Sequence, residues 1–496
     1  MTRCTNALII ASYRRGIGSM IDMKNTNYDH WKKLQQGALI KNPSDKSSRS
    51  KKFVGDRGYL HFDGRVTLKR INGSNETDPA YRLLTSDDII ARRSFLPFLR
   101  EDQRARKYRD KAPLTLEGNK RVHSQQYSTI KNRPIMYASH LDACVYSLYS
   151  SILGTNYERL VLQQKLTNTV LAYRPVPLAG TDRNKSNIDF AKELYDKIKS
   201  FGGDIGILLL DISGFFDNLD HNHLSEKWCR VLGVHELPND HRAVYKNITG
   251  FRYVFADEAY KALGLDKDAL VSLRQDRKAV LCTPSDFNEK IKKQNLIHKN
   301  KSGRGIPQGS PISGLLANVY MFDFDIKVKS LVETIGGHYA RYSDDIAILV
   351  EPSKLTGIYQ AVQDLIEDEG LKISAKKTDC FVYQQTPGTF VNVIRKLEPT
   401  NTINLKQYPQ YLGFIFTEEN IHIRGNTLAR RFRGGKAFLL SSERWKYFSL
   451  AARKTGSRSM PSQVEGVRKK IKPIVNEAQK ARAQLNCERN KVIINP

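Results

Sequence analysis

The pattern of apolar and polar residues changes near Arg133. Before it, short apolar runs alternate with basic, serine-rich stretches, and we predict a helix around residues 86–110. After it, the apolar residues of "RPIMYASHLDACVYSLYSSIL" recur at the three- and four-residue spacing of an amphipathic helix. Residues 205–212, "IGILLLDI", form a continuous apolar run, which is the pattern of a buried strand. A distinct folded region is therefore expected from about residue 131.

Helical and hairpin patterns alternate downstream of that strand. "HNHLSEKWCRVLGV" and residues 310–336 are predicted helices, the second opened by Pro311, and a later helix ends at Gly370. "GHYARYSDDIAILVE" is predicted as a hairpin with Asp344 and Asp345 at its tip, and "YPQYLGFIFTEENIHIRG" as another hairpin. This order resembles a split βαββαβ unit, which is a small antiparallel sheet with helices on one face.

The charge of the chain narrows the class of partner. A net charge of +29 indicates a polyanion, most often a nucleic acid. An anionic membrane surface is the weaker alternative, because no apolar run approaches the roughly 18 residues of a spanning helix. The six cysteines form no CxxC pair, which argues against zinc ribbons and disulfide scaffolds and suits a reducing cytoplasm. The apolar core of "NALIIAS" is too short for a signal peptide.

Carboxylates from two segments are predicted to meet at one end of the sheet. The buried strand ends at Asp211, and in a split βαββαβ sheet it can lie beside the hairpin that carries Asp344 and Asp345. Three neighbouring carboxylates repel one another and require a multivalent cation. Hard oxygen ligands suit Mg²⁺. Two such ions, roughly 4 Å apart, can activate a 3′ hydroxyl and stabilise a leaving pyrophosphate.

A glycine-rich loop is the third candidate element. "GRGIPQGSPISGLLANVY" covers residues 303–320, and its glycines allow the backbone to approach a ligand closely. Gln308 can form hydrogen bonds in a groove without adding charge. A simple Pro/Gly turn before a helix explains the loop when it is taken alone. The loop together with Asp211 and Asp344–Asp345, in this order, is far more specific.

These segments together resemble the palm of reverse transcriptases. "DISGFFD" resembles motif A, "GIPQGSPISGLLAN" motif B, "YSDD" motif C, "EGLKISAKKT" motif D and "YLGFIF" motif E. Upstream, "NRPIMYASHLDACVYSLYSSIL" and "AYRPVPL" resemble finger segments of the bacterial group that includes retron, group II intron and defence-associated enzymes. The resemblance covers about residues 131–416. It implies an α+β right-hand polymerase with RNA-directed DNA polymerase activity.

The expected order of regions along the chain rests partly on the resemblance. It implies fingers (131–203) and a split-βαββαβ palm with motifs A to E (204–424). The flanking regions match no motif of the family, and their composition predicts a basic N-terminal region (1–130) and a basic, helical, thumb-like C-terminal region (425–496). The separation between Asp211 and Gln308 is longer than a compact palm needs. An insertion is therefore expected at about residues 251–300, where the sequence shows no recognisable chemistry.

Individual roles follow from the resemblance by position. Asp211 and Asp344 would be the main ligands of two Mg²⁺ ions, with Asp345 and the backbone carbonyl of Ile212 assisting, and Mn²⁺ can substitute. Phe216 aligns with the aromatic gate that excludes a ribose 2′-OH. Lys377 would be the motif D lysine near the pyrophosphate, and the adjacent Lys376 leaves this assignment open. Gln308 and Gly309 would line the nucleotide and template side of the pocket. Arg133 and Arg174 are candidate contacts of the triphosphate or the template. Each of the two arginines has a structural salt bridge as its alternative role. Tyr411 to Phe414 would support the primer end or belong to the core.

Several alternatives remain open on the sequence. An RNA-dependent RNA polymerase usually carries an aspartate where this chain has Phe216, so DNA synthesis is favoured. A catalytically silent RNA-binding scaffold would keep the fold, but all three carboxylates, Gln308 and Lys377 are present. No HNH-type Cys/His cluster follows motif E, which weakens a group II intron maturase. A stand-alone enzyme of the defence-associated, abortive-infection type is favoured over a retron enzyme, and the two differ in their partner RNA.

The predicted partners are a structured non-coding RNA as template, dNTP substrates and a DNA product. No membrane association is expected, and a homo-oligomer remains open. The surplus charge lies in the N-terminal arm and in residues 425–496, which hold 17 Lys and Arg against 4 Asp and Glu. Aromatic residues of these arms are candidates to stack on unpaired bases: Tyr59, Tyr108, Phe432, Trp445 and Tyr447. Neither the primer nor the template sequence can be inferred from the residues.

Overall fold

The fold is taken from a computed structural model of the full chain. It describes residues 58–64, 82–84, 86–108, 116–117, 120–121, 128–181, 183–276, 280–397 and 408–424. The chain divides into two compact units. Unit 1 comprises residues 1–159 and 220–316, and unit 2 comprises residues 160–219 and 317–496. The predicted thumb-like region and most of the N-terminal arm lie outside the described residues.

A four-stranded sheet organises unit 1, in the order β4-β1-β6-β7. β1 (Phe98–Tyr108) pairs antiparallel with β4 (Ser128–Tyr137) and parallel with β6 (Arg252–Phe255), and β7 (His298–Lys299) pairs with β6. The prediction of a helix around residues 86–110 was wrong, because only the short α6 (Asp87–Ala91) is helical there. β1 is fixed by pairing with distant strands, and such pairing overrides local propensity.

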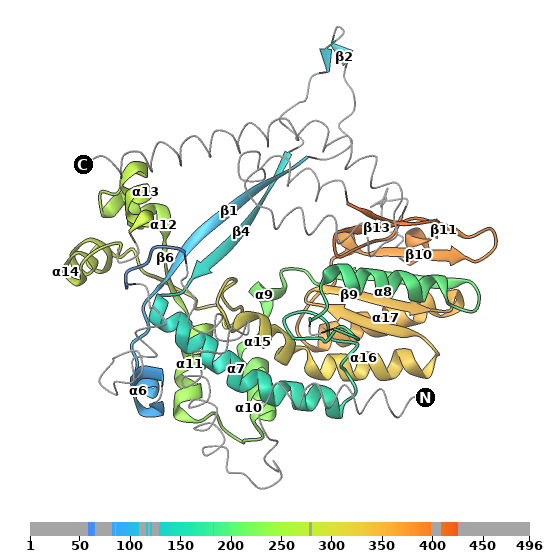
Figure 1. The fold of residues 1–496 in the computed structure, drawn as a ribbon, viewed down its shortest axis with the longest axis horizontal. Coiled ribbons are helices and arrows are strands. Elements are labelled where there is room, and N and C mark those ends of the chain that lie inside the picture. The colour runs from blue at the N-terminus through green and yellow to red at the C-terminus, as the bar shows by residue number, and fades with distance from the viewer. Residues whose placement is uncertain are drawn as a thin grey trace, which may run out of the picture. The chain divides into compact units, whose positions relative to one another are not determined.

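The helices of unit 1 surround this sheet (Figure 1). α7 (His140–Gln163) begins seven residues later than predicted, since residues 133–137 belong to β4. α10 (His221–Leu232) confirms the helix predicted after the buried strand, and α11 (Asn239–Thr249) follows it. The segment 251–300 also carries short helices: α12 (Ala256–Ala262), α13 (Lys267–Gln275), α14 (Pro284–Asp286) and the π-helix η2 (Phe287–Lys292).

The segment expected as an insertion is an integral part of unit 1. Its strands β6 and β7 extend the sheet, and Val254, Ala259 and Ile291 are buried in one core cluster with Leu99 of β1. The division into units therefore cuts across the predicted boundaries, because residues 220–316 pack with the N-terminal part of the chain.

Unit 2 contains a five-stranded antiparallel sheet in the order β11-β10-β5-β9-β8. The strands are β5 (Ile205–Asp211), β8 (His338–Tyr342), β9 (Asp345–Val350), β10 (Asp379–Gln384) and β11 (Thr389–Asn392). β5 is the central strand and every residue in it is buried, as its continuous apolar run predicted. The predicted hairpin is also confirmed, as β8 and β9 pair directly.

Both faces of this sheet are covered (Figure 1). On one face, Ile207, Leu349 and Phe381 pack in a cluster with α8 (Asn187–Lys199) and with Phe414. On the other, α17 (Leu355–Asp368) contacts β5 and α16 (Phe322–Thr334) contacts β8. Gly206 allows this packing, because a Cβ there would lie 2.5 Å from Leu355 Cγ. The split βαββαβ expectation thus holds for α16 and α17, and α8 adds cover on the opposite face.

Two other predicted elements differ in detail. The single helix predicted over 310–336 is divided into α15 (Ser313–Tyr320) and α16 by Met321. The second hairpin is a three-stranded sheet of β12 (Gln410–Tyr411), β13 (Phe414–Phe416) and β14 (Ile421–Ile423). The sequence pattern therefore located both elements but missed the break at Met321 and the third strand.

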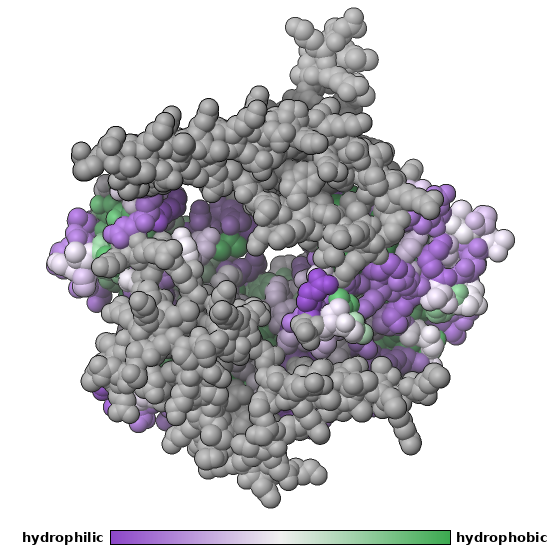
Figure 2. Space-filling model, viewed as in Figure 1, coloured by the Kyte–Doolittle hydropathy of each residue, from purple (hydrophilic) through white to green (hydrophobic). Residues whose placement is uncertain are grey.

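The described surface is largely polar. Figure 2 shows mainly hydrophilic residues where the placement is described. The large apolar side chains exposed among the described residues are Ile89, Leu162, Tyr173, Val271, Val280 and Val391. None of the described helices combines the length and the apolar character that a membrane crossing requires.

Candidate active site

Asp211 and Asp345 lie directly opposite each other in the sheet of unit 2. β5 ends at Asp211, β9 begins at Asp345, and the two residues are partners in the antiparallel ladder. Directly opposed residues have Cβ atoms about 4.5–5.5 Å apart and project from the same face of the sheet. The buried apolar runs that follow Asp345 and precede Asp211 fix this register. The predicted meeting of the two carboxylates is therefore present in the fold.

Asp344 occupies the turn between β8 and β9. The preceding residue, Ser343, has a positive φ of 61°, so the turn is tight and strained for a residue with a side chain. The backbone N–H of Ile212 donates to the carbonyl oxygen of Asp344 at 3.1 Å. This hydrogen bond holds the chain leaving β5 against the turn, and so brings the third acidic residue to the same end of the sheet.

Charge repulsion acts strongly on Asp345. Burial is the main cause that raises the pKa of Asp345 to about 7, and the carboxylates of Asp344 and Asp211 raise it further. Lys377 lowers the pKa of Asp345, but less than these effects raise it. The positive charge near the three carboxylates is therefore too small to offset the burial and the charge repulsion that act on Asp345.

Lys377 forms an ion pair with Asp211 Oδ1. It lies in the 3-10 helix η4 (Ala375–Lys377), which is tied to β5 because Ser374 N donates to Asp211 O at 2.8 Å. Lys377 is 43% exposed at its side chain, so the ammonium group approaches the carboxylate from the solvent side. The position near the carboxylates agrees with a role at the reacting phosphates, which remains a prediction.

The donor set fits a hard divalent cation, although no ready-made cage is present. Within the described part of the chain, no group of three or more His, Cys, Asp or Glu side chains is arranged to hold a metal ion. Asp211, Asp344 and Asp345 nevertheless offer only carboxylate oxygens, which is the chemistry that Mg²⁺ prefers. The raised pKa of Asp345 is the observation that supports the fit, because a cation would relieve the repulsion that contributes to it.

Phe216 is half-buried and lies five residues after Asp211 in the sequence. It lies in α9 (Phe215–Asn218), which Gly214 opens with a left-handed φ of 55°. Phe215 is buried in the core, whereas Phe216 lies edge-on to the exposed Tyr173 with ring centroids 6.3 Å apart. The two neighbouring phenylalanines therefore have different surroundings, and the one predicted as the sugar gate is the accessible one.

Arg174 is engaged with the backbone of its own loop. Its Nη1 donates to Thr167 O at 2.9 Å and to Val170 O at 2.7 Å. Both acceptors are backbone carbonyls, so this nitrogen stabilises the turn before Tyr173. The two predicted roles of Arg174, a nucleotide or template contact and a structural salt bridge, remain predictions.

Gln308, Gly309 and Arg133 lie in unit 1. The backbone N–H of Met136 in β4 donates to Gln308 O at 2.7 Å. Gly309 has a φ of 105°, and a Cβ there would lie 3.0 Å from Met136 O. The loop thus lies closely against β4, and only glycine fits at this position. Arg133 is exposed on β4, opposite Gln103. The roles of these three residues towards a nucleotide remain predictions.

The structure shows the surroundings of the motif E aromatics and of Tyr59, which the sequence had named as candidates to contact nucleic acid. Tyr411 and Phe414 are buried in the core cluster beneath α8, which favours the core alternative for motif E. Tyr59 donates to Ala138 O at 2.7 Å and stacks on His140 with ring centroids 5.0 Å apart, so its ring is already packed within unit 1. Phe432, Trp445 and Tyr447 lie outside the described residues.

Sequence reasoning missed a buried network that supports the turn. Arg341 is fully buried, and its Nη1 donates to Ser343 O at 2.9 Å. The same guanidinium pairs with Asp325 of α16, which also accepts a hydrogen bond from Tyr339 Oη at 2.6 Å. Arg341 directly precedes the YSDD motif in the sequence, but nothing in its local pattern identifies Asp325 as its partner.

Comparisons with known proteins identify the family of the sequence. Residues 155–416 match the family described as reverse transcriptase (RNA-dependent DNA polymerase). Over 118 residues, the chain is 27% identical to the retron Mx162 reverse transcriptase of Myxococcus xanthus, a match that covers 21% of this chain and 24% of that protein. The chain therefore spans about a quarter of the length of that curated relative.

Solved structures of telomerases are also similar. Apo telomerase from Candida tropicalis, truncated from its C-terminal domain, gives a TM-score of 0.33 at 10% identity, covering 59% of this chain and 52% of that chain. Telomerase from Candida albicans, in complex with a fragment of telomeric RNA, gives a TM-score of 0.34 at 12% identity, covering 68% of this chain and 54% of that chain.

Proposed function

Since the chain belongs to the reverse transcriptase (RNA-dependent DNA polymerase) family, we propose that it adds dNTPs to a primer 3′ end under the direction of an RNA template. The observation that carries the proposal is the ladder pairing of Asp211 with Asp345, with Asp344 in the adjoining turn. Family membership agrees with the α+β right-hand polymerase class expected from the sequence. The match leaves the N-terminal and C-terminal regions unassigned.

Asp211, Asp344 and Asp345, with the Ile212 carbonyl, would hold two Mg²⁺ ions. Such ions, or Mn²⁺ in their place, supply activation of the 3′ hydroxyl and stabilisation of the pyrophosphate when bound. Binding of a cation would remove the repulsion that raises the pKa of Asp345. It would also compete with Lys377 for Asp211, and a displaced Lys377 would be available to the leaving phosphates.

Phe216 would select the sugar of the incoming nucleotide. Its ring contacts the ring of Tyr173 and that of Phe215, with centroids 6.3 Å and 5.5 Å apart. A ring supported in this way cannot move aside easily, so it would exclude a 2′-OH by steric clash. The same support favours a DNA product over an RNA product.

We further propose a dedicated structured RNA as template and a role in bacterial antiphage defence in the cytoplasm. The net charge of +29 supports a stably bound polyanion. The 27% identity to a retron reverse transcriptase keeps a retron-type enzyme as the second candidate. The two differ in the partner RNA that would copurify with the chain.

The decisive experiment supplies the purified full-length chain with Mg²⁺ and labelled dNTPs, first alone and then with an RNA template and a DNA primer. A labelled product that disappears on RNase pretreatment of the template is expected. Sequencing the product and testing its attachment to protein identifies the template and the primer type. A chain that binds RNA but forms no product with Mg²⁺ or with Mn²⁺ would be the catalytically silent RNA-binding scaffold instead.

A further inference from the structure

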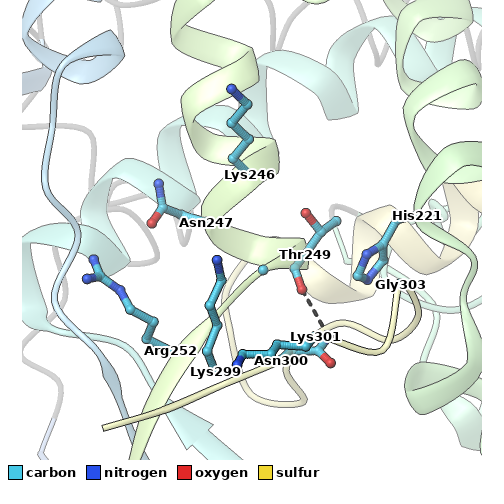
Figure 3. Close-up of a pocket in the computed structure, with 10 residues that line it drawn as sticks. His221, Lys246, Asn247, Thr249, Arg252, Lys299, Asn300, Lys301 and Gly303 are labelled. Atoms are coloured by element: carbon cyan, nitrogen blue, oxygen red, sulfur yellow. Dashed lines mark hydrogen bonds between the residues drawn. The ribbon is translucent and has the colours of Figure 1, made fainter.

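A basic pocket lies in the segment whose sequence showed no recognisable chemistry. It is a cavity of about 580 Å³ in unit 1, between the end of α11 and the β6–β7 pair (Figure 3). Four cationic residues line it: Lys246, Arg252, Lys299 and Lys301. Among the described residues, no carboxylate belongs to the lining. In Figure 3, the side chains of Arg252 and Lys299 extend upwards from the lower part of the view, and Asn247 and Lys246 project from α11 above them.

Two of these cations are held together by the strand register. Arg252 and Lys299 are directly opposite each other in the β6–β7 ladder, where like charges destabilise the pairing. Arg252 Nη2 donates to Phe95 O at 2.9 Å, but this neutral acceptor leaves the charge uncompensated. In the described part of the chain, no carboxylate forms an ion pair with either side chain, whereas Lys290 in the same segment pairs with Asp286. The pocket therefore keeps a local repulsion that an anion would relieve.

A helix dipole explains only part of this charge. Lys246 lies in the last turn of α11, where a cation is favourable without any ligand. Arg252, Lys299 and Lys301 belong to the strands and the loop beyond, where that effect is absent, since it falls off within one turn.

The neutral polar residues of the pocket are occupied by internal hydrogen bonds. Asn300 Nδ2 donates to Thr249 O at 3.0 Å, as the dashed line in Figure 3 marks. Thr249 Oγ1 donates to Tyr245 O at 2.7 Å, and Asn247 Nδ2 donates to Ala243 O at 2.9 Å. The pocket thus offers mainly positive charge, because its amide and hydroxyl groups already donate to backbone carbonyls. Positive charge without further oriented polar groups suits phosphates, which carry no sequence information.

We propose that this pocket binds the phosphodiester backbone of the template RNA without reading its sequence. The proposal rests on the proposed function, because RNA must be held before any DNA has been made. Arg252 and Lys299 are ladder partners, whereas Lys246 lies in α11 and Lys301 follows β7. Cations from three different segments suit successive phosphates of one strand better than a single anion. The site is distinct from the basic arms, to which the sequence alone had assigned RNA binding.

The test compares two full-length double variants of equal charge change. Lys299→Glu with Lys301→Glu alters the pocket, whereas Lys267→Glu with Lys292→Glu alters exposed lysines of unit 1 outside it. Binding of a labelled RNA stem-loop is followed by fluorescence anisotropy across a salt series, without dNTPs. The pocket variant should bind more weakly, and its log K versus log salt slope should be smaller by about 0.9 for each phosphate that it no longer neutralises. The control variant should keep the wild-type slope.

Thermal melting tests whether the variants are folded. Lys299→Glu places an acidic residue opposite Arg252, so the melting temperature of the pocket variant should hold or rise. Equal loss of RNA binding in both variants would reduce the effect to net charge and overturn the proposal. A DNA stem-loop and ATP serve as further probes. Two other results would also overturn the proposal. The first is a change of the salt slope for the DNA probe alone. The second is displacement of RNA by ATP from the wild type but not from the pocket variant.

The outcome is separable from the failure of polymerase activity. Asp344→Asn with Asp345→Asn removes the predicted metal ligands in unit 2 and should leave the salt dependence of RNA binding unchanged. If the wild-type chain forms no DNA product while the pocket variant still shows the expected loss of RNA binding, the proposed function alone would be disproved.

Discussion

Arg341 and Asp325 form a bidentate ion pair in which both side chains are fully buried. Arg341 Nε donates to Asp325 Oδ1 at 2.7 Å and Nη2 donates to Oδ2 at 2.6 Å. Because Arg341 Nη1 also holds Ser343 O, the pair connects α16 to the turn that carries Asp344. A buried ion pair of this kind fixes the relative positions of the elements that it joins, whereas its net contribution to the free energy of folding can be close to zero.

Breaking this pair should be costly and should disturb the turn. Asp325→Ala leaves the Arg341 charge unpaired in the core, and such a change costs about 3–5 kcal/mol. We expect this loss in urea unfolding, together with reduced dNTP incorporation under conditions where the variant is folded. Glu333→Ala on the same helix is the matched control, because the Lys329–Glu333 pair is partly exposed and should contribute at most about 1 kcal/mol. Equal effects of the two variants would contradict a special role of the buried pair.

The carboxylate cluster should be dispensable for folding and essential for activity. Asp344→Asn with Asp345→Asn should abolish incorporation, while the melting temperature of the protein in EDTA holds or rises, because repulsion is removed. Wild-type amounts of product from this variant would refute the metal-site assignment.

The same cluster predicts a pH dependence of stability in the metal-free protein. The folded pKa of Asp345 is raised to about 7 from an ordinary value of 3.8, so the folded state binds the proton more tightly than the unfolded state. This contribution to stability is present below the ordinary pKa and is lost as the pH rises towards and through about 7. Urea unfolding in EDTA from pH 4 to pH 8 should show this loss in the wild type and a flatter profile in Asp345→Asn. Identical profiles would mean that the pKa of Asp345 is not raised in the folded protein.

The elements that position the carboxylates could be predicted because their signals are local. The apolar run of β5 and the alternation of β8 and β9 are each contained in a few adjacent residues. The Arg341–Asp325 pair could not be found in this way, because its residues are 16 apart and belong to different elements. The strand β1 was mistaken for a helix for the same reason, since its partners β4 and β6 lie elsewhere in the chain.

The sugar gate can be tested with a neighbouring control. Phe216→Ala should open space beside the 2′ position and raise the use of rNTPs relative to dNTPs, because the gate acts by clash. Phe215→Ala removes a buried ring instead and should cost about 3–5 kcal/mol of stability without changing sugar choice. Steady-state kinetics with matched dNTP and rNTP pairs measure the ratio. An unchanged ratio in Phe216→Ala would show that the ring serves only packing.

The glycine loop makes a prediction about backbone fit. Gly309→Ala forces a side chain into φ 105° with its Cβ 3.0 Å from Met136 O, a strain of roughly 1–3 kcal/mol. We expect lower stability and a higher KM for dNTPs, since Gln308 is adjacent. Gly357→Ala is the control, because this position in α17 is open and alanine is the better helix former by roughly 0.5–1 kcal/mol. A Gly309→Ala variant with wild-type stability would show that the loop relaxes freely.

Lys377 and its neighbour Lys376 offer the last test, because the sequence alone did not decide between them. The structure describes an ion pair of Asp211 with Lys377, whereas Lys376 is exposed beside it. If Lys377 assists the leaving pyrophosphate, Lys377→Gln should lower the rate of single-nucleotide incorporation on the order of 10²-fold or more. It should also lower the Mg²⁺ concentration needed for half-maximal rate, since the ammonium group no longer competes for Asp211. Lys376→Gln should change neither quantity. Rapid-quench incorporation across an Mg²⁺ series separates the two effects, and a rate loss confined to Lys376→Gln would transfer the role to that residue.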